Sequence, residues 1–159
     1  MICLGLIALI ALLDLMLKSG IEALPEDTFP RTIPGFGGRV ELRRVHNEGF
    51  PMGVLRQSPR LVQGFSLFVI CTVLLRFSLL LPQKRRRLEK LGLAMVLGGA
   101  LSNLTDRFFR HYVVDYLYIK RKPLNRIVWN LGDGFIALGM LITLSSGLLP
   151  KQWGSAKKE

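Results

Sequence analysis

Cysteine, histidine and acidic side chains are scarce in this chain of 159 residues. It has two cysteines and two histidines, and its 22 Lys and Arg outnumber its 11 Asp and Glu. Cys3 and Cys71 both lie in apolar runs, where a cysteine is typical of a small buried side chain and not of a disulfide or a metal pair. His46 and His111 are too isolated to complete a metal site with them. The sequence therefore argues against a metalloenzyme.

The chain also lacks the features of a nucleic-acid-binding protein. Its net charge is +11, but the basic residues are not interleaved with aromatic ones and no nucleic-acid-binding motif is present. The cluster Lys84-Arg85-Arg86-Arg87 follows a long apolar stretch, so we expect it to meet anionic lipid headgroups. The excess of positive charge therefore points to a membrane and not to nucleic acid.

Long apolar stretches account for most of the chain. Half of the residues are apolar and the mean hydropathy is +0.35, and a helix needs about 20 mostly apolar residues to cross the hydrocarbon core. Four stretches approach this length, at about residues 1–17, 61–81, 88–105 and 131–149. The first lacks a basic start and an A-x-A cleavage site, so we expect an uncleaved helix and not a signal peptide. The sequence predicts one all-α membrane domain over residues 1–159, with four transmembrane helices.

The short loop 82–90 carries five Lys and Arg, which favours the cytoplasmic side. Loops 18–60 and 106–130 would then face outward, although they carry seven and six Lys and Arg, so charge alone does not settle the orientation. Val40–Asn47 alternates roughly between apolar and charged residues, which predicts a small extramembrane β element in the first outward loop.

Two features inside the predicted spans concern helix packing. Ala94, Gly98 and Ser102 share one face of the third span, which predicts close approach of a neighbouring helix. Arg76 lies within the second span, and we expect its long side chain to extend to the cytoplasmic interface. The alternative is an interhelical partner for Arg76.

Two aspartates stand just outside predicted spans, each in a short polar cluster. Asp115 lies in Val113-Val114-Asp115-Tyr116, and Asp133 lies in Trp129-Asn130-Leu131-Gly132-Asp133. A carboxyl group at membrane depth is costly and is typical of a functional site. Two carboxyls that converge at one membrane face would suit acid–base chemistry on a substrate in the bilayer. The alternatives are an ordinary loop aspartate at 115, and a helix whose N-cap is Asn130 with Asp133 in its first turn.

A third polar cluster ends the third span. On a helix, Asn103, Asp106 and Arg107 share a face at i, i+3 and i+4. The structural alternative is a polar helix end in which Asp106 and Arg107 form an ion pair.

Taken together, these clusters resemble a known family. N-L-x-D-R, then V-V-D-Y, then an aromatic-N-x-small-D cluster that opens the last helix, in this order on four spans, is similar to the lipoprotein signal peptidase (signal peptidase II) family. Asp14-Leu15-Met16-Leu17-Lys18 resembles the family's D-x-x-x-K, and Asn47-Glu48-Gly49 resembles its N-x-G element.

The resemblance implies an aspartyl endopeptidase of the bacterial inner membrane, with its active site toward the outer leaflet. The family removes the signal peptide from prolipoproteins, on the amino side of a cysteine that carries diacylglycerol. The implied partners are this precursor and membrane lipid, with no metal or organic cofactor, and we expect a monomer. By motif position the catalytic pair is Asp115 and Asp133. The supporting polar residues are Asn47, Gly49, Asn103, Asp106, Arg107 and Asn130, and Asp14 and Lys18 form a structural polar pair.

The chain departs from the family pattern in three places. Phe50-Pro51-Met52-Gly53 follows Gly49 where the family usually has A-A-F-G/S, and this change leaves open a paralogue with altered substrate choice. Trp129 and Gly132 stand where phenylalanine and alanine are common, and we expect these two changes to be mild. A non-catalytic four-helix membrane protein that binds lipid or a partner is the remaining alternative.

Overall fold

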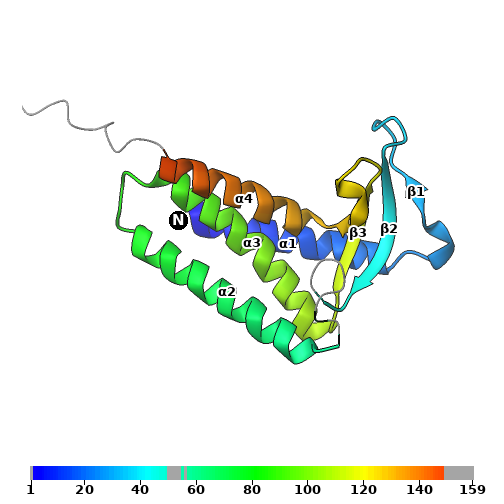
Figure 1. Ribbon diagram of the computed structural model, residues 1–159, viewed down its shortest axis with the longest axis horizontal. Helices are drawn as coiled ribbons and strands as arrows, with labels where there is room; N and C mark the ends of the chain where they lie inside the picture. The colour runs from blue at the N-terminus through cyan, green and yellow to red at the C-terminus, as the bar shows by residue number, and fades with distance from the viewer. Residues whose placement is uncertain (1, 50–54, 56, 149–159) are drawn as a thin grey trace, which may run out of the picture.

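Four helices form a bundle with a small sheet at one end, as Figure 1 shows. The computed structural model describes residues 2–49, 55 and 57–148. The helices are α1 (Ile2–Glu22), α2 (Pro59–Leu80), α3 (Arg87–Phe109) and α4 (Leu131–Leu148). The N-terminus and the α2–α3 connection lie at the end of the bundle opposite the sheet (Figure 1).

The helix α3 is the inner element of the bundle. It contacts α1, α2 and α4, and most of its buried residues are small or apolar. A Cβ at Gly98 would lie 2.8 Å from the Cβ of Ile10 on α1, and Ala94 and Ser102 are fully buried. The predicted close approach of a neighbouring helix to this face is therefore confirmed.

The outer helices carry apolar side chains on their exposed surfaces. Among the described residues, α1 and α2 are each long and apolar enough to cross a membrane, and α4 is apolar but shorter. On α2, Leu61, Phe68 and Leu75 are each more than 60% exposed. Such a continuous exposed apolar surface is typical of contact with lipid.

The sheet has four antiparallel strands in the order β1-β2-β3-β4. Its strands are β1 (Arg31–Thr32), β2 (Val40–Asn47), β3 (Val113–Ile119) and β4 (Val128–Trp129). The predicted strand Val40–Asn47 is thus confirmed. The prediction of a β element in the first outward loop alone was incomplete, because the second outward loop supplies β3 and β4. Figure 1 shows the sheet across the end of the bundle.

Two helices are longer than the apolar stretches that predicted them. The helix α1 continues past residue 17 to Glu22, and α3 runs past residue 105 to Phe109, because the polar side chains of Lys18 and Asp106 are buried against other elements of the protein. The alternative expectation for Arg76, an interhelical partner, is confirmed, since its Nη2 lies 2.5 Å from Oε1 of Glu89 on α3. Burial of Glu89 in the bundle provides this interhelical partner, and Arg86 Nη1 binds its other oxygen at 2.9 Å.

Candidate active site

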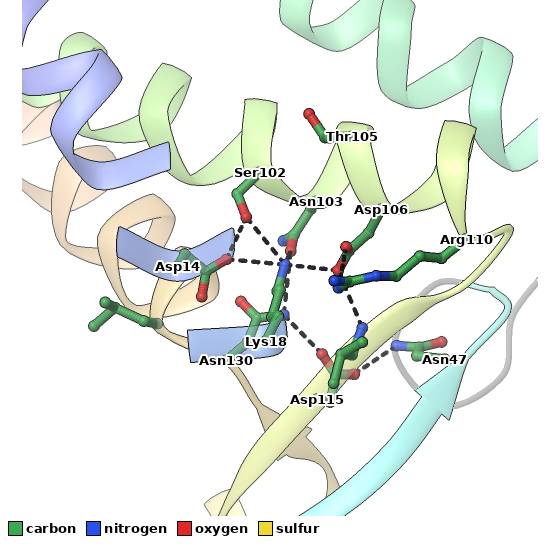
Figure 2. A network of polar contacts seen from close by, with 12 residues as sticks. Asp14, Lys18, Asn47, Ser102, Asn103, Thr105, Asp106, Arg110, Asp115 and Asn130 are labelled. Atoms are coloured by element: carbon green, nitrogen blue, oxygen red, sulfur yellow. Dashed lines mark hydrogen bonds and ion pairs between the residues drawn. The ribbon is translucent and has the colours of Figure 1, made fainter. Parts of the chain in front are cut away.

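A cavity of about 670 Å³ lies where the ends of α3 and α4 meet the sheet. Asp115 and Asp133, predicted as a pair, both line it. Four of the predicted supporting residues line it as well: Asn47, Gly49, Asn103 and Arg107. The other predicted site residues lie in the hydrogen-bond network connected to this cavity. Figure 2 shows this network, with side chains from α1, α3 and the sheet converging.

Asp115 is held by two amide groups. It stands on β3 and is 4% exposed. Asn130 Nδ2 donates to its Oδ1 at 2.7 Å, and Asn47 Nδ2 donates to its Oδ2 at 3.0 Å. Burial and the nearby charge of Asp133 raise the pKa of Asp115 to about 7, although the two amide hydrogen bonds oppose this shift. The neutral form of this carboxyl is therefore favoured to a higher pH than that of an ordinary aspartate.

Asp133 stands in the first turn of α4, where it also caps the helix. Its backbone N–H donates to Asn130 Oδ1 at 2.8 Å, and the N–H of Asn130 donates to Asp133 Oδ2 at 3.2 Å. This reciprocal pair has the pattern of a capping box, so the expected N-cap role of Asn130 is confirmed. Asn103 Nδ2 donates to the other oxygen, Oδ1, at 2.9 Å. Capping and participation in the cavity are thus compatible in one side chain.

Asn130 connects the two aspartates. Its Nδ2 donates to Asp115 and also to Asn103 Oδ1, at 3.2 Å, while its Oδ1 accepts from the backbone of Asp133. Because Asn103 in turn donates to Asp133, the two asparagines fix both carboxyls relative to one another. Asn130 is 1% exposed, so water does not compete for these hydrogen bonds.

The predicted polar pair of Asp14 and Lys18 forms a buried cluster behind the cavity. Both side chains are fully buried, and Lys18 Nζ lies 2.9 Å from Asp14 Oδ2 and 3.1 Å from Asp106 Oδ2. The same ammonium donates to Asn103 Oδ1 at 2.6 Å. This contact orients the side-chain carbonyl of Asn103 toward Lys18, so that Nδ2 of Asn103 faces Asp133. Figure 2 shows Lys18 at the centre of these contacts.

Asp106 connects α3 to the start of β3, just before Asp115. Its Oδ1 pairs with Arg110 at 2.8 Å, and its Oδ2 accepts the backbone N–H of Val114 at 3.2 Å. The expected alternative of an Asp106–Arg107 ion pair is therefore replaced by pairs with Lys18 and Arg110. Arg107 instead donates through Nη2 to the carbonyl of Gly49 at 3.3 Å.

A local hydrogen bond fixes the conformation of the Asn47-Glu48-Gly49 element. The backbone N–H of Gly49 donates to Asn47 Oδ1 at 3.1 Å, which is the pattern of an Asx-turn. This hydrogen bond orients the amide so that Nδ2 faces Asp115. Residues 50–53, the segment that departs from the family pattern, lie outside the described residues.

Sequence reasoning missed two participating side chains. The buried Tyr116 donates to Asp14 Oδ1 at 3.2 Å and accepts the N–H of Leu131 at 3.1 Å. Ser102, expected only to permit helix packing, also donates to Asp14 Oδ2 at 2.6 Å. The position of Tyr116 next to Asp115 in the sequence could have indicated its role. The role of Ser102 depends on how α1 packs on α3, which the sequence does not show.

Gly132 contributes more than was expected. A Cβ at this position would lie 2.8 Å from Asp14 Oδ2 and 3.1 Å from Asn130 Oδ1. Glycine therefore lets the start of α4 approach the polar network closely. Among the described residues, no three His, Cys, Asp or Glu side chains are grouped as metal ligands.

Two classes of comparison identify the family. A family profile described as Signal peptidase (SPase) II matches residues 6–149. The chain is 37% identical to the lipoprotein signal peptidase of Moorella thermoacetica over 119 residues, which are 75% of each chain. It is 31% identical to that of Brucella ovis over 139 residues, which are 82% of this chain and 81% of the relative.

Solved structures support the fold. A bacterial membrane enzyme determined by the in meso method at 2.3 Å resolution aligns with a TM-score of 0.79 and 14% identity, over 99% of this chain and 93% of the other. A second, at 1.9 Å resolution, aligns with a TM-score of 0.74 and 16% identity, over 94% and 93%. At these identities the likeness concerns the fold alone. The family profile and the two relatives carry the assignment, and the chain therefore belongs to the signal peptidase II family of membrane aspartic peptidases.

Proposed function

We propose that the enzyme cleaves diacylglyceryl-modified prolipoproteins on the amino side of the modified cysteine, with Asp115 and Asp133 as its catalytic pair. The observation that carries the proposal is that both carboxyls line one cavity and both accept from Asn130, Asp115 from its side-chain amide and Asp133 from its backbone N–H. The printed name of the relatives, lipoprotein signal peptidase, supports the substrate class.

The chemistry follows from two nearby carboxyls that do not both ionise readily. Because burial and Asp133 raise the pKa of Asp115 to about 7, the pair retains one proton near neutral pH. The ionised member takes a proton from water, and the resulting hydroxide attacks the scissile carbonyl. The protonated member hydrogen-bonds to the carbonyl oxygen. Proton transfer to the leaving amine then breaks the C–N bond. The pair titrates as a unit, so neither aspartate is assigned a fixed role.

The supporting residues hold this pair in position. Asn47 and Asn130 donate to Asp115, and Asn103 donates to Asp133. Arg107 lines the cavity and binds the carbonyl of Gly49, which suits a role in shaping the substrate site. Asp106, Lys18 and Asp14 support Asn103 from behind.

We also propose that all four helices span the bacterial inner membrane, as a monomer, with the sheet outward. Because α3 is covered by its neighbours, it needs less apolar surface than a helix that faces lipid on its own. The active site would then lie near the outer leaflet, where a lipid-anchored precursor presents its modified cysteine.

The direct test uses the purified enzyme with a diacylglyceryl-modified prolipoprotein and with the same precursor before modification. Mass spectrometry of the products should give a single cut that leaves the modified cysteine as the new N-terminus. Equal cleavage of the unmodified precursor, or a cut at another bond, would contradict the proposed substrate class.

A further inference from the structure

The cavity has two chemically different ends, which meet at the two aspartates. Asp133 stands in the first turn of α4, and Ile136, Ala137 and Met140 on the following turns line the cavity along this helix, with Ala137 and Met140 exposed. Tyr118, which is three residues beyond Asp115 on β3, lines it at the sheet. One end is thus apolar and lies along a helix, and the other lies over an extramembrane sheet.

The sheet end is positively charged. Arg43 of β2 lines the cavity with its guanidinium carbon 3.5 Å from the centroid of the Tyr118 ring. Its Nε and Nη2 donate to Glu41 Oε2 at 3.2 and 2.8 Å, and Lys120 binds the other oxygen of Glu41. These two cations and one carboxylate carry a net charge of +1. Apart from the two aspartates, the described charged residues that line the cavity are Arg43, Arg107 and Arg126 with one acid, Glu48.

A further cation, Arg126, stands at the same cavity. Arg126 closes the short 3-10 helix η3 (Leu124–Arg126), and it lines the same cavity with an exposed side chain. Arg43 and Arg126 come from different loops of the chain, so the positive charge is gathered at the cavity by the fold. In a cleft with low-dielectric walls, such charges favour an occupant of opposite sign.

The two ends fit the two parts of a precursor. A signal segment is apolar and suits the wall formed by Ile136, Ala137 and Met140, whereas the mature chain leaves the membrane for water. On the basis of the proposed function, we propose that the sheet end holds the first mature residues after the modified cysteine. Arg43 and Arg126 then make the enzyme favour precursors that have acidic residues there and disfavour those that have Lys or Arg.

The test uses three diacylglyceryl-modified precursor peptides that differ at one position shortly after the modified cysteine, with Asp, Ser or Lys. We expect wild-type kcat/KM to decrease in the order Asp, Ser, Lys. Arg126→Gln should lower the Asp-to-Lys ratio about two- to fivefold, the range of a solvent-accessible charge pair, and Arg126→Lys should preserve it. The matched control is Arg121→Gln, because Arg121 is exposed on the same connection but is not among the described residues lining the cavity, and it should leave the ratio unchanged.

Equal wild-type cleavage of all three peptides would overturn the charge preference and leave the proposed function standing. The preference would also be overturned if Arg121→Gln lowered the ratio as much as Arg126→Gln. An equal loss for all three peptides in Arg126→Gln, with the ratio intact, would assign this end to the bilayer or to folding, and not to the mature chain. Failure of the wild type to cleave any of them would refute the proposed function, and the preference with it.

Discussion

Asp115 is a buried carboxyl whose environment favours its neutral form. Burial first, and the charge of Asp133 second, raise its pKa from 3.8 to about 7. Between these two values the native protein binds a proton that the unfolded chain releases, so the contribution of Asp115 to stability is full below about pH 4 and is lost as the pH rises through about 7.

This sign gives a prediction for the pH dependence of stability. The thermal unfolding midpoint of the wild type should fall, relative to that of Asp115→Asn, as the pH increases from about 5 to about 8. Differential scanning fluorimetry of both proteins in the same detergent measures this difference. A constant difference over the range would mean that Asp115 ionises as it does in the unfolded chain.

Lys18 is a fully buried cation that contacts several buried acceptors from α1 and α3. Its removal would leave Asp14 without the ion pair and Asp106 with Arg110 alone. Breaking a buried pair in this way costs about 3–5 kcal/mol, so we expect Lys18→Met to lower the free energy of unfolding by this amount. Chemical denaturation in detergent measures the effect. Lys120→Met is the control, because the Lys120 side chain is 43% exposed in its ion pair with Glu41, and an equal effect of both changes would contradict this account.

At the scale of elements, glycines allow α3 and α4 to pack closely against each other. A Cβ at Gly139 would lie 2.5 Å from the carbonyl oxygen of Gly92 and 2.9 Å from the nitrogen of Val96. We therefore expect Gly139→Ala to destabilise the protein by about 1–3 kcal/mol, the usual cost of overpacking. Gly134→Ala on the same helix meets no atom within 4 Å and should be neutral or stabilising by up to about 1 kcal/mol. If denaturation midpoints changed alike for both, the close helix contact would be in error.

The elements also mark what the sequence could predict. The strand Val40–Asn47 and the helix that Asn130 caps follow from local patterns, and both are present. The strand Val113–Ile119 was not predicted, although its β-branched and aromatic residues are typical of a strand, because its first four residues are all buried and show no alternation of apolar and polar side chains. The helices α1 and α3 run beyond the predicted apolar stretches, because apolarity alone does not show that a helix continues through residues, such as Lys18, that are buried against protein.

The site was predictable as a set of residues but not as a network. Motif order identified Asp115, Asp133 and their asparagines, whereas the contacts of Lys18 with Asn103 and Asp106 join residues more than 80 positions apart. Such contacts depend on how α1 packs on α3, which spacing within one helix does not determine.

At the scale of the whole molecule, both predicted outward loops lie at the sheet end of the bundle, and the α2–α3 loop lies at the other end (Figure 1). We therefore expect a cysteine at exposed position 39 and one at exposed position 84 to be on opposite sides of the membrane. In a background without Cys3 and Cys71, a membrane-impermeant maleimide should label Arg39→Cys in spheroplasts, and Lys84→Cys only after lysis. The reverse pattern would invert the proposed orientation.

The central claim is that Asp115 and Asp133 act as one catalytic pair, and a cleavage assay on a diacylglyceryl-modified prolipoprotein tests it most directly. Wild type should release the signal peptide, whereas Asp115→Asn and Asp133→Asn, each shown to be folded and inserted, should have no measurable cleavage. Appreciable cleavage by either variant would contradict the assignment of the pair.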